Sequence, residues 1–144
     1  MRKLSLLMSL SVLLFAAQCA DHPDNPLPDL KVETTLSGAN ENPALTTSAT
    51  GKFTGTLNQQ TRLLKFTLTF SSLTPSAGHI HSGAVGVNGP VIIPFPSLTT
   101  SPYSYEVVLT PAQVDLLKTN MLYTNLHTPA NPGGEIRGQL MIVP

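Results

Sequence analysis

The sequence predicts an all-β fold, an antiparallel sandwich or barrel of about eight strands with one short helix. Apolar and polar residues alternate with a period of two in several short segments, which is typical of strands with one buried and one solvated face. Gly, Pro, Ser and Asn cluster between these segments, where turns are needed. Only 11% of the residues are charged and Trp is absent, a composition that suits short strands better than long solvated helices.

The first three expected strands lie at 31–36, 51–57 and 62–73. The first alternates loosely and ends at a Ser-Gly turn signal. The other two alternate strongly, and their apolar faces consist of Phe53, Gly55, Leu57, Leu64, Phe66, Leu68 and Phe70. The polar residues 58–61 between them fit a hairpin loop. We therefore expect these two segments to be neighbouring strands with one buried face each.

The second half of the chain contains the remaining expected strands and the only convincing helix. The strands are expected at 77–81, 90–95, 103–109, 122–127 and 135–143. Thr110 fits a helix N-cap, Pro111 fits the first helical position, and Gln113 completes a capping box ahead of apolar residues. We expect this helix to cover about 111–118.

The N-terminal segment has the composition of an export signal. Met1-Arg2-Lys3 is basic, residues 4–17 carry no charge, and the only cysteine, Cys19, follows them closely. An apolar stretch of this length fits a secretory signal peptide, because a membrane-spanning helix needs about 20 residues. The segment resembles a bacterial lipobox, so we expect 1–18 to be a lipoprotein signal peptide and Cys19 to carry the lipid. The alternative is an ordinary signal peptide.

The chain beyond the leader divides into a tether and one domain. Residues 19–30 are rich in Pro and Asp and lack apolar periodicity, as expected of a flexible tether to a membrane surface. Residues 31–144 form the expected β domain. The chain has a formal net charge of zero and no run of Lys and Arg, which excludes nucleic-acid binding. We therefore expect an exported protein, anchored in the bacterial cell envelope on the periplasmic or outer surface.

Three histidines form the main candidate for a functional site. His79 and His81 lie two positions apart in an expected strand, so both side chains are expected on one face. His127 closes another expected strand. Three imidazoles suit zinc or copper better than magnesium or calcium, which prefer oxygen ligands. One interpretation of the pattern is therefore a metal site at His79, His81 and His127.

The same histidines also fit a purely structural polar cluster. Imidazoles on a strand often donate hydrogen bonds to carboxylates or backbone carbonyls, and Glu135 is an obvious acceptor. Glu135 and Arg137 share a face at the start of the last expected strand. Arg137 either takes part in a cross-strand ion pair that fixes register, or lies at the mouth of a pocket and attracts an anion. With Asn125, these two residues are expected to form the polar cluster.

Several short motifs occur in the order found in a known domain family. They are Leu36-Ser-Gly-Ala-Asn-Glu-Asn-Pro43, Ala49-Thr-Gly51, Gly78-His-Ile-His81, Asn88-Gly-Pro-Val91, Leu122-Tyr-Thr-Asn-Leu-His-Thr128 and Asn131-Pro-Gly-Gly-Glu-Ile-Arg-Gly-Gln-Leu140. On these residues, most of the chain resembles the CHRD domain, first described as a repeat in chordin. The resemblance implies an immunoglobulin-like β-barrel distantly similar to copper/zinc superoxide dismutases. It implies no general activity, and bacterial members look like exported single-domain proteins.

The dismutase similarity carries over to only part of the site. His79 and His81 look like the paired copper ligands, His127 resembles the later copper histidine, and Arg137 resembles the arginine near that copper. No histidine lies between His81 and His127, where the bridging and zinc ligands would be, and the disulfide is missing. The resemblance therefore implies at most a mononuclear three-histidine site.

Two functions from different classes follow from these observations. The first is a surface-anchored, non-enzymatic binding or structural module, which takes a protein or another extracellular ligand. The second is an envelope protein that binds copper or zinc through His79, His81 and His127, with weak dismutase-like redox activity. Convergence of the three rings on one point favours the second. A His127 ring that points away, or a hydrogen bond from each imidazole to the backbone or to Glu135, favours the first.

Overall fold

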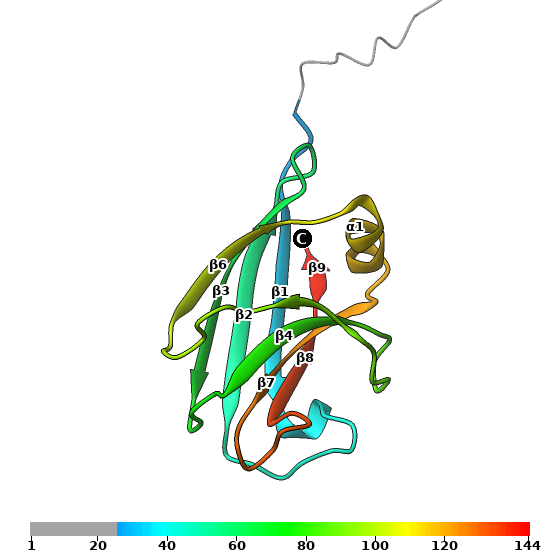
Figure 1. The fold of residues 1–144 in the computed structure, drawn as a ribbon. Helices are drawn as coiled ribbons and strands as arrows, with labels where there is room; N and C mark the ends of the chain where they lie inside the picture. Colours follow the sequence, from blue (N-terminus) through cyan, green and yellow to red (C-terminus); the bar gives the residue numbers. More distant parts are fainter. Residues whose placement is uncertain (1–25) are drawn as a thin grey trace, which may run out of the picture.

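The computed structural model of the chain describes residues 26–144 (Figure 1). The expected signal peptide, Cys19 and the first part of the tether lie outside these residues. The elements of the described part are β1 (Leu30–Ser37), η1 (Gly38–Asn40), β2 (Thr50–Leu57), β3 (Leu63–Ser71), β4 (Ala77–Ser82), β5 (Val91–Pro94), β6 (Tyr103–Val108), α1 (Pro111–Lys118), β7 (Leu122–His127), β8 (Ile136–Gln139) and β9 (Met141–Val143). No helix among residues 26–144 is long and apolar enough to cross a membrane.

All the strands belong to one antiparallel sheet, which curls around the core (Figure 1). The strand order is β5-β4-β7-β8-β1-β2-β3-β6, and β9 pairs with β1 beside β8. The predicted all-β fold with one short helix is therefore confirmed. The last expected strand is divided, because the chain pairs with β7 and β1 as β8 and then continues along β1 as β9.

The core is built from the apolar faces that the alternation predicts. Phe53 and Leu57 of β2 and Leu64 and Leu68 of β3 are fully buried. The strands pair in register over their whole length, and the Phe53 and Phe66 rings stack with their centroids 4.5 Å apart. Removing each such side chain from water contributes about 1.5–3 kcal/mol. The β2–β3 hairpin thus forms one wall of the core.

The helix follows from its local sequence. The Thr110 hydroxyl accepts a hydrogen bond from the Gln113 backbone, the Gln113 side chain accepts one from the Thr110 backbone, and Pro111 occupies the first turn. This is the predicted capping box. Val114 and Leu117 are buried, so the helix covers one end of the core (Figure 1).

The outer face of β4, β7 and β8 carries the polar residues that the sequence analysis singled out. His79 pairs with Asn125 across β4 and β7, and Asn125 pairs with Arg137 across β7 and β8. Their neighbours Ile80 and Leu126 point the other way and are fully buried in the core. Because side chains alternate along a strand, this register places the polar residues together on the outside of the sheet.

Three loops cover this outer face, and we name them by their residues: the 38–49 loop, the 83–90 loop and the 128–135 loop. The Asn42 amide donates to the Gly86 carbonyl at 2.7 Å, and the Asn88 amide donates back to the Asn42 carbonyl at 2.7 Å. Thr47 donates to Glu135, which joins the 38–49 loop to the 128–135 loop. The candidate site therefore lies between the sheet and a layer of interlocked loops.

Candidate metal centre

The three histidines converge, although they come from two strands. His79 and His81 lie on the same face of β4, and His127 ends the neighbouring strand β7. One ring nitrogen of each residue lies within 4.8 Å of the others. His79 Nδ1 and His127 Nε2 are 3.1 Å apart. Strand pairing thus brings together residues that are 48 positions apart in the sequence.

In two of these rings, the nitrogen that does not take part in the cluster forms a hydrogen bond to a backbone carbonyl. His81 Nδ1 lies 2.9 Å from the Gly89 carbonyl oxygen, and His127 Nδ1 lies 2.9 Å from the Pro132 carbonyl oxygen. A carbonyl only accepts, so each Nδ1 carries the proton and each neutral ring presents the Nε2 lone pair. His81 Nε2 is buried and has no hydrogen-bond partner in the described part of the chain. Metal-ligating histidines show this arrangement.

The spacing of the nitrogens fits a tetrahedral metal ion. Zinc binds imidazole at about 2.0–2.1 Å, which places two ligand nitrogens about 3.3 Å apart in a tetrahedron. The 3.1 Å between His79 Nδ1 and His127 Nε2 is close to this value. The separations within the set reach at most 4.8 Å, so the rings would move closer together to bind one ion. The three rings can therefore hold zinc or copper.

Electrostatics keeps two of the rings neutral and able to bind a metal. Burial, together with the neighbouring His127 and His81, lowers the pKa of His79 below its usual value. Burial is also the main factor that lowers the pKa of His127. Neutral imidazole is the form that ligates a metal. At neutral pH these two histidines therefore have lone pairs to offer.

Arg137 packs behind the histidines and also lines a surface depression of about 370 Å³, together with Glu41 and Gln139. Its guanidinium lies 3.4 Å from the centre of the Tyr123 ring, and that ring stacks on His81 at 4.7 Å. The guanidinium also donates to the carbonyls of Ala84 and Val87 and to the Asn88 side chain. With 2% of its surface exposed, Arg137 is among the most buried side chains of the described part.

The ion-pair interpretation of Arg137 therefore needs correction. It forms no ion pair within residues 26–144, where the ion pairs are Lys52–Glu33 and Lys65–Glu106. Although it lines a depression, only 2% of its surface is exposed and its donors are bonded to the 83–90 loop. The donors of its planar guanidinium reach the carbonyls of the 83–90 loop, so its role is to hold that loop over His81.

Glu135 belongs to the loop network and not to the imidazoles. Its carboxylate accepts hydrogen bonds from Thr47, Thr128 and Asn131. The bond from Thr47, followed by that from Asn131, lowers the pKa of Glu135 below its usual value. Glu135 therefore fixes the 128–135 loop as a charged acceptor, and the expected bond from a histidine is absent from the hydrogen bonds of residues 26–144.

Glu41 is the residue that the sequence interpretation missed. It lies in the 38–49 loop, and one of its carboxylate oxygens, Oε1, is buried without a hydrogen-bond partner in the described part. Burial raises its pKa to about 7, although Arg137 and Asn125 act in the opposite direction. No local pattern marks this glutamate, because its neighbours come from β7 and β8 and from the 128–135 loop.

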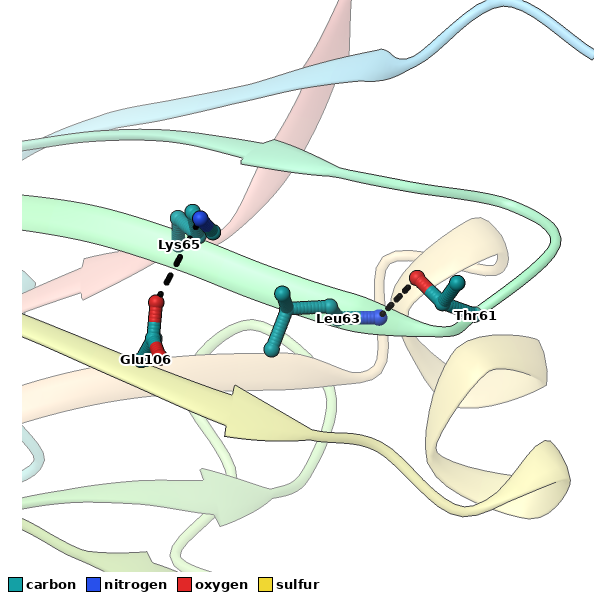
Figure 2. Close-up of polar contacts among 4 residues, drawn as sticks. All are labelled: Thr61, Leu63, Lys65 and Glu106. Carbon is teal, nitrogen blue, oxygen red and sulfur yellow. Dashed lines mark hydrogen bonds and ion pairs between the residues drawn. The ribbon is translucent and has the colours of Figure 1, made fainter.

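A large surface depression lies away from this site. It has a volume of about 780 Å³ and lies across β1, β2, β3 and β6, where the side chains are mainly Thr, Lys and Glu. Lys65 and Glu106 face each other there at 3.5 Å, and both are well exposed (Figure 2). Such a pair contributes little, so we assign no chemistry to this depression.

Comparison with known families identifies the domain. The family model described as the CHRD domain matches residues 32–140. The chain belongs to the CHRD domain family. The match extends from β1 to the end of β8, so it includes the three histidines and all three covering loops of this CHRD domain. Comparisons with curated proteins and with solved structures yield no match. Membership places the domain among binding or structural modules.

Proposed function

We propose that this CHRD domain is a non-enzymatic metal-binding module of the bacterial cell envelope, which holds zinc or copper at His79, His81 and His127. The convergence of three ring nitrogens within 4.8 Å of one another carries the proposal. The buried, unpartnered Nε2 of His81 supports it, because a buried acceptor without a partner is unfavourable and a bound cation removes that penalty.

The position of Arg137 supports a binding role over a dismutase-like one. An anionic substrate would need a cation that it can reach from solvent, whereas this guanidinium is occupied by Tyr123 and the 83–90 loop. The three histidines are also the only metal-ligating cluster found among residues 26–144. One ion per domain is therefore the stoichiometry we propose.

The N-terminal sequence supports the location. A basic start, an uncharged stretch and a single cysteine at the expected cleavage point are the features of an exported lipoprotein. We propose that the mature chain begins at Cys19 and is tethered to the membrane surface by the lipid on that residue.

Metal analysis tests the function directly. Protein purified without chelators and titrated with Zn²⁺ or Cu²⁺ should hold one ion per chain by elemental analysis. Zn²⁺ at 100 times its Kd should stabilise the domain by about 2.7 kcal/mol, a rise in Tm of about 10 °C. Variants His79→Ala, His81→Ala and His127→Ala should lose this rise. His22→Ala is the matched control, because His22 is the only other histidine of the chain.

The opposite result also has a clear meaning. If neither ion binds stoichiometrically and neither raises Tm, the three histidines form a structural polar cluster. The domain is then a module whose ligand is a protein or another extracellular molecule, as its family membership allows.

A further inference from the structure

We propose that Asn125 Oδ1 is the fourth ligand of this metal site, which closes an N3O coordination shell with His79, His81 and His127. The inference rests on the proposed metal-binding function and deepens it. It assigns a further ligand and predicts that the bound ion has no position open to solvent molecules or substrates.

The fold places Asn125 at the site. It lies two residues before His127 on β7, so both side chains are on the outer face, and it pairs with His79 across β4 and β7. Asn125 Oδ1 is 3.0 Å from His127 Nε2, about the same distance as separates His127 Nε2 from His79 Nδ1. Only 3% of the Asn125 surface is exposed. The surrounding protein, and not solvent, therefore determines the position of this oxygen.

The number of protons at this contact points to a cation. His127 uses its Nδ1 proton on the Pro132 carbonyl, so its neutral ring has a lone pair at Nε2. The Asn125 oxygen also has only lone pairs. His79 can supply one proton to His127 Nε2, but the contact between His127 Nε2 and Asn125 Oδ1 then still joins two acceptors. A metal ion bonded to both atoms removes this repulsion.

The amide of Asn125 faces the histidines with its oxygen, because Oδ1 is the atom that lies 3.0 Å from His127 Nε2. Asn125 also lowers the pKa of Glu41, so the two side chains lie near each other. A carboxylate accepts hydrogen bonds, so Glu41 suits the NH2 end of this amide and leaves the oxygen for the metal. Such support from outside the coordination shell is common at metal sites.

The ligand set determines which ion the site prefers. Three imidazoles and one amide oxygen suit a divalent ion such as Zn²⁺ in a tetrahedral site, whereas Cu(I) favours softer sulfur ligands. A site closed by a protein oxygen resembles structural zinc sites, since catalytic sites keep one position for water. We therefore expect the site to hold its ion without activating a bound water.

Cobalt substitution tests the fourth ligand in the full-length protein. Co²⁺ reports its coordination through visible absorption, and azide changes that spectrum only where it can displace a ligand such as water. The wild-type Co²⁺ spectrum should be intense, as for four ligands, and insensitive to azide. Asn125→Leu, which has a similar shape and no oxygen, should admit water, become sensitive to azide and bind Zn²⁺ about 10–100-fold more weakly.

Two further variants complete the design. Asn125→Asp keeps an oxygen at the site, so it should retain the azide-insensitive spectrum and bind Zn²⁺ at least as tightly as the wild type. Gln139→Leu removes another amide from the outer face, on β8 and two residue pairs along the β7–β8 ladder from Asn125, and should change neither property.

The outcomes separate the two proposals. A wild-type Co²⁺ spectrum that azide alters would overturn the fourth ligand and leave the three-histidine site intact, and this test needs no variant to fold. Unchanged Zn²⁺ affinity in a folded Asn125→Leu protein would overturn it as well. Failure of the wild type to bind Zn²⁺ or Co²⁺ at all would instead overturn the proposed function.

Discussion

Arg137 shows how far a single residue can depart from its sequence context. The neighbouring Glu135 suggests an ion pair, yet the acceptors that Arg137 reaches lie about 50 positions away in the 83–90 loop. A guanidinium offers five donors in one plane, so it can bond several carbonyls while its face stacks on Tyr123. These partners are brought together by the β7–β8 pairing, and no spacing along the chain reveals them.

Arg137→Met should therefore destabilise the domain substantially. Methionine keeps part of the packing but leaves the Ala84 and Val87 carbonyls without their donor and removes the cation over Tyr123. We expect a loss of about 2–4 kcal/mol in the free energy of unfolding, measured by denaturant titration of metal-free protein. Lys65→Met is the control, since Lys65 is well exposed and faces Glu106 (Figure 2), and it should cost no more than about 1 kcal/mol. Equal losses in the two variants would contradict this role for Arg137.

Glu41 should make stability depend on pH in an unusual direction. Its pKa rises to about 7 in the folded chain, because burial disfavours the charged carboxylate. The folded state then holds a proton that the unfolded chain has released. The stabilisation is complete below about pH 4.5, the usual pKa, and is lost as pH rises to about 7.

Glu41→Gln isolates this effect in metal-free protein. Between pH 4.5 and 7 the wild type should lose on the order of 1–2 kcal/mol relative to the variant, less than the full shift implies because the side chain is partly exposed. Denaturation at several pH values measures the difference. A constant difference across this range would show that Glu41 titrates as an ordinary exposed carboxyl.

At the scale of single elements, the sequence predicts whatever is encoded locally. The alternation in β2 and β3 and the Thr110 capping box both depend on neighbouring residues, and both are present in the structure. The boundary between β8 and β9 was not predicted, because alternation continues through it while the pairing partner changes. The short helix η1 was not predicted either. A Cβ atom at Gly38 would lie 2.4 Å from the Leu45 carbonyl oxygen, so this turn of the 38–49 loop requires glycine.

The capping box should account for a measurable part of the helix's stability. Thr110→Ala removes the acceptor for the Gln113 backbone N–H, and the unfolding free energy should fall by about 1 kcal/mol. Thr119→Ala at the other end of α1 should have a smaller effect, because its hydroxyl donates to carbonyls that close the last turn. Denaturant titration of both variants tests this difference, and a larger loss in Thr119→Ala would contradict it.

At the scale of the whole molecule, the site depends on how the three loops meet. The sequence predicts that His79 and His81 share a face, since that follows from strand periodicity, and they do. It leaves open whether His127 joins them, because that depends on the β4–β7 register. The contacts of Glu41 and Asn125 depend on the 38–49 and 128–135 loops folding over the sheet, and loop paths carry no periodic signal.

The fold also separates the N-terminal connection from the metal site. Strand β1 begins at Leu30 and ends at Ser37. Ser37 pairs with Arg137 across β1 and β8, and Arg137 is linked through further cross-strand pairs to Asn125 and His79, so this end of β1 lies level with the site. At about 3.3 Å per residue, the two ends of β1 are about 23 Å apart. In Figure 1, η1 and the loop between β7 and β8 lie together at the end opposite the start of β1. A lipid on Cys19 would therefore be connected to the domain at the end opposite the proposed site.

This separation predicts that anchoring leaves metal exchange unchanged. Lipidated protein in vesicles and soluble Cys19→Ser protein should take up Zn²⁺ with the same affinity, and a chelator should remove it at the same rate, because no bilayer surface covers the site. Co-sedimentation with vesicles first establishes that the wild type is anchored and that the variant is not. Much slower exchange in the anchored protein would mean that the bilayer covers the histidines, and would contradict the prediction drawn from this separation.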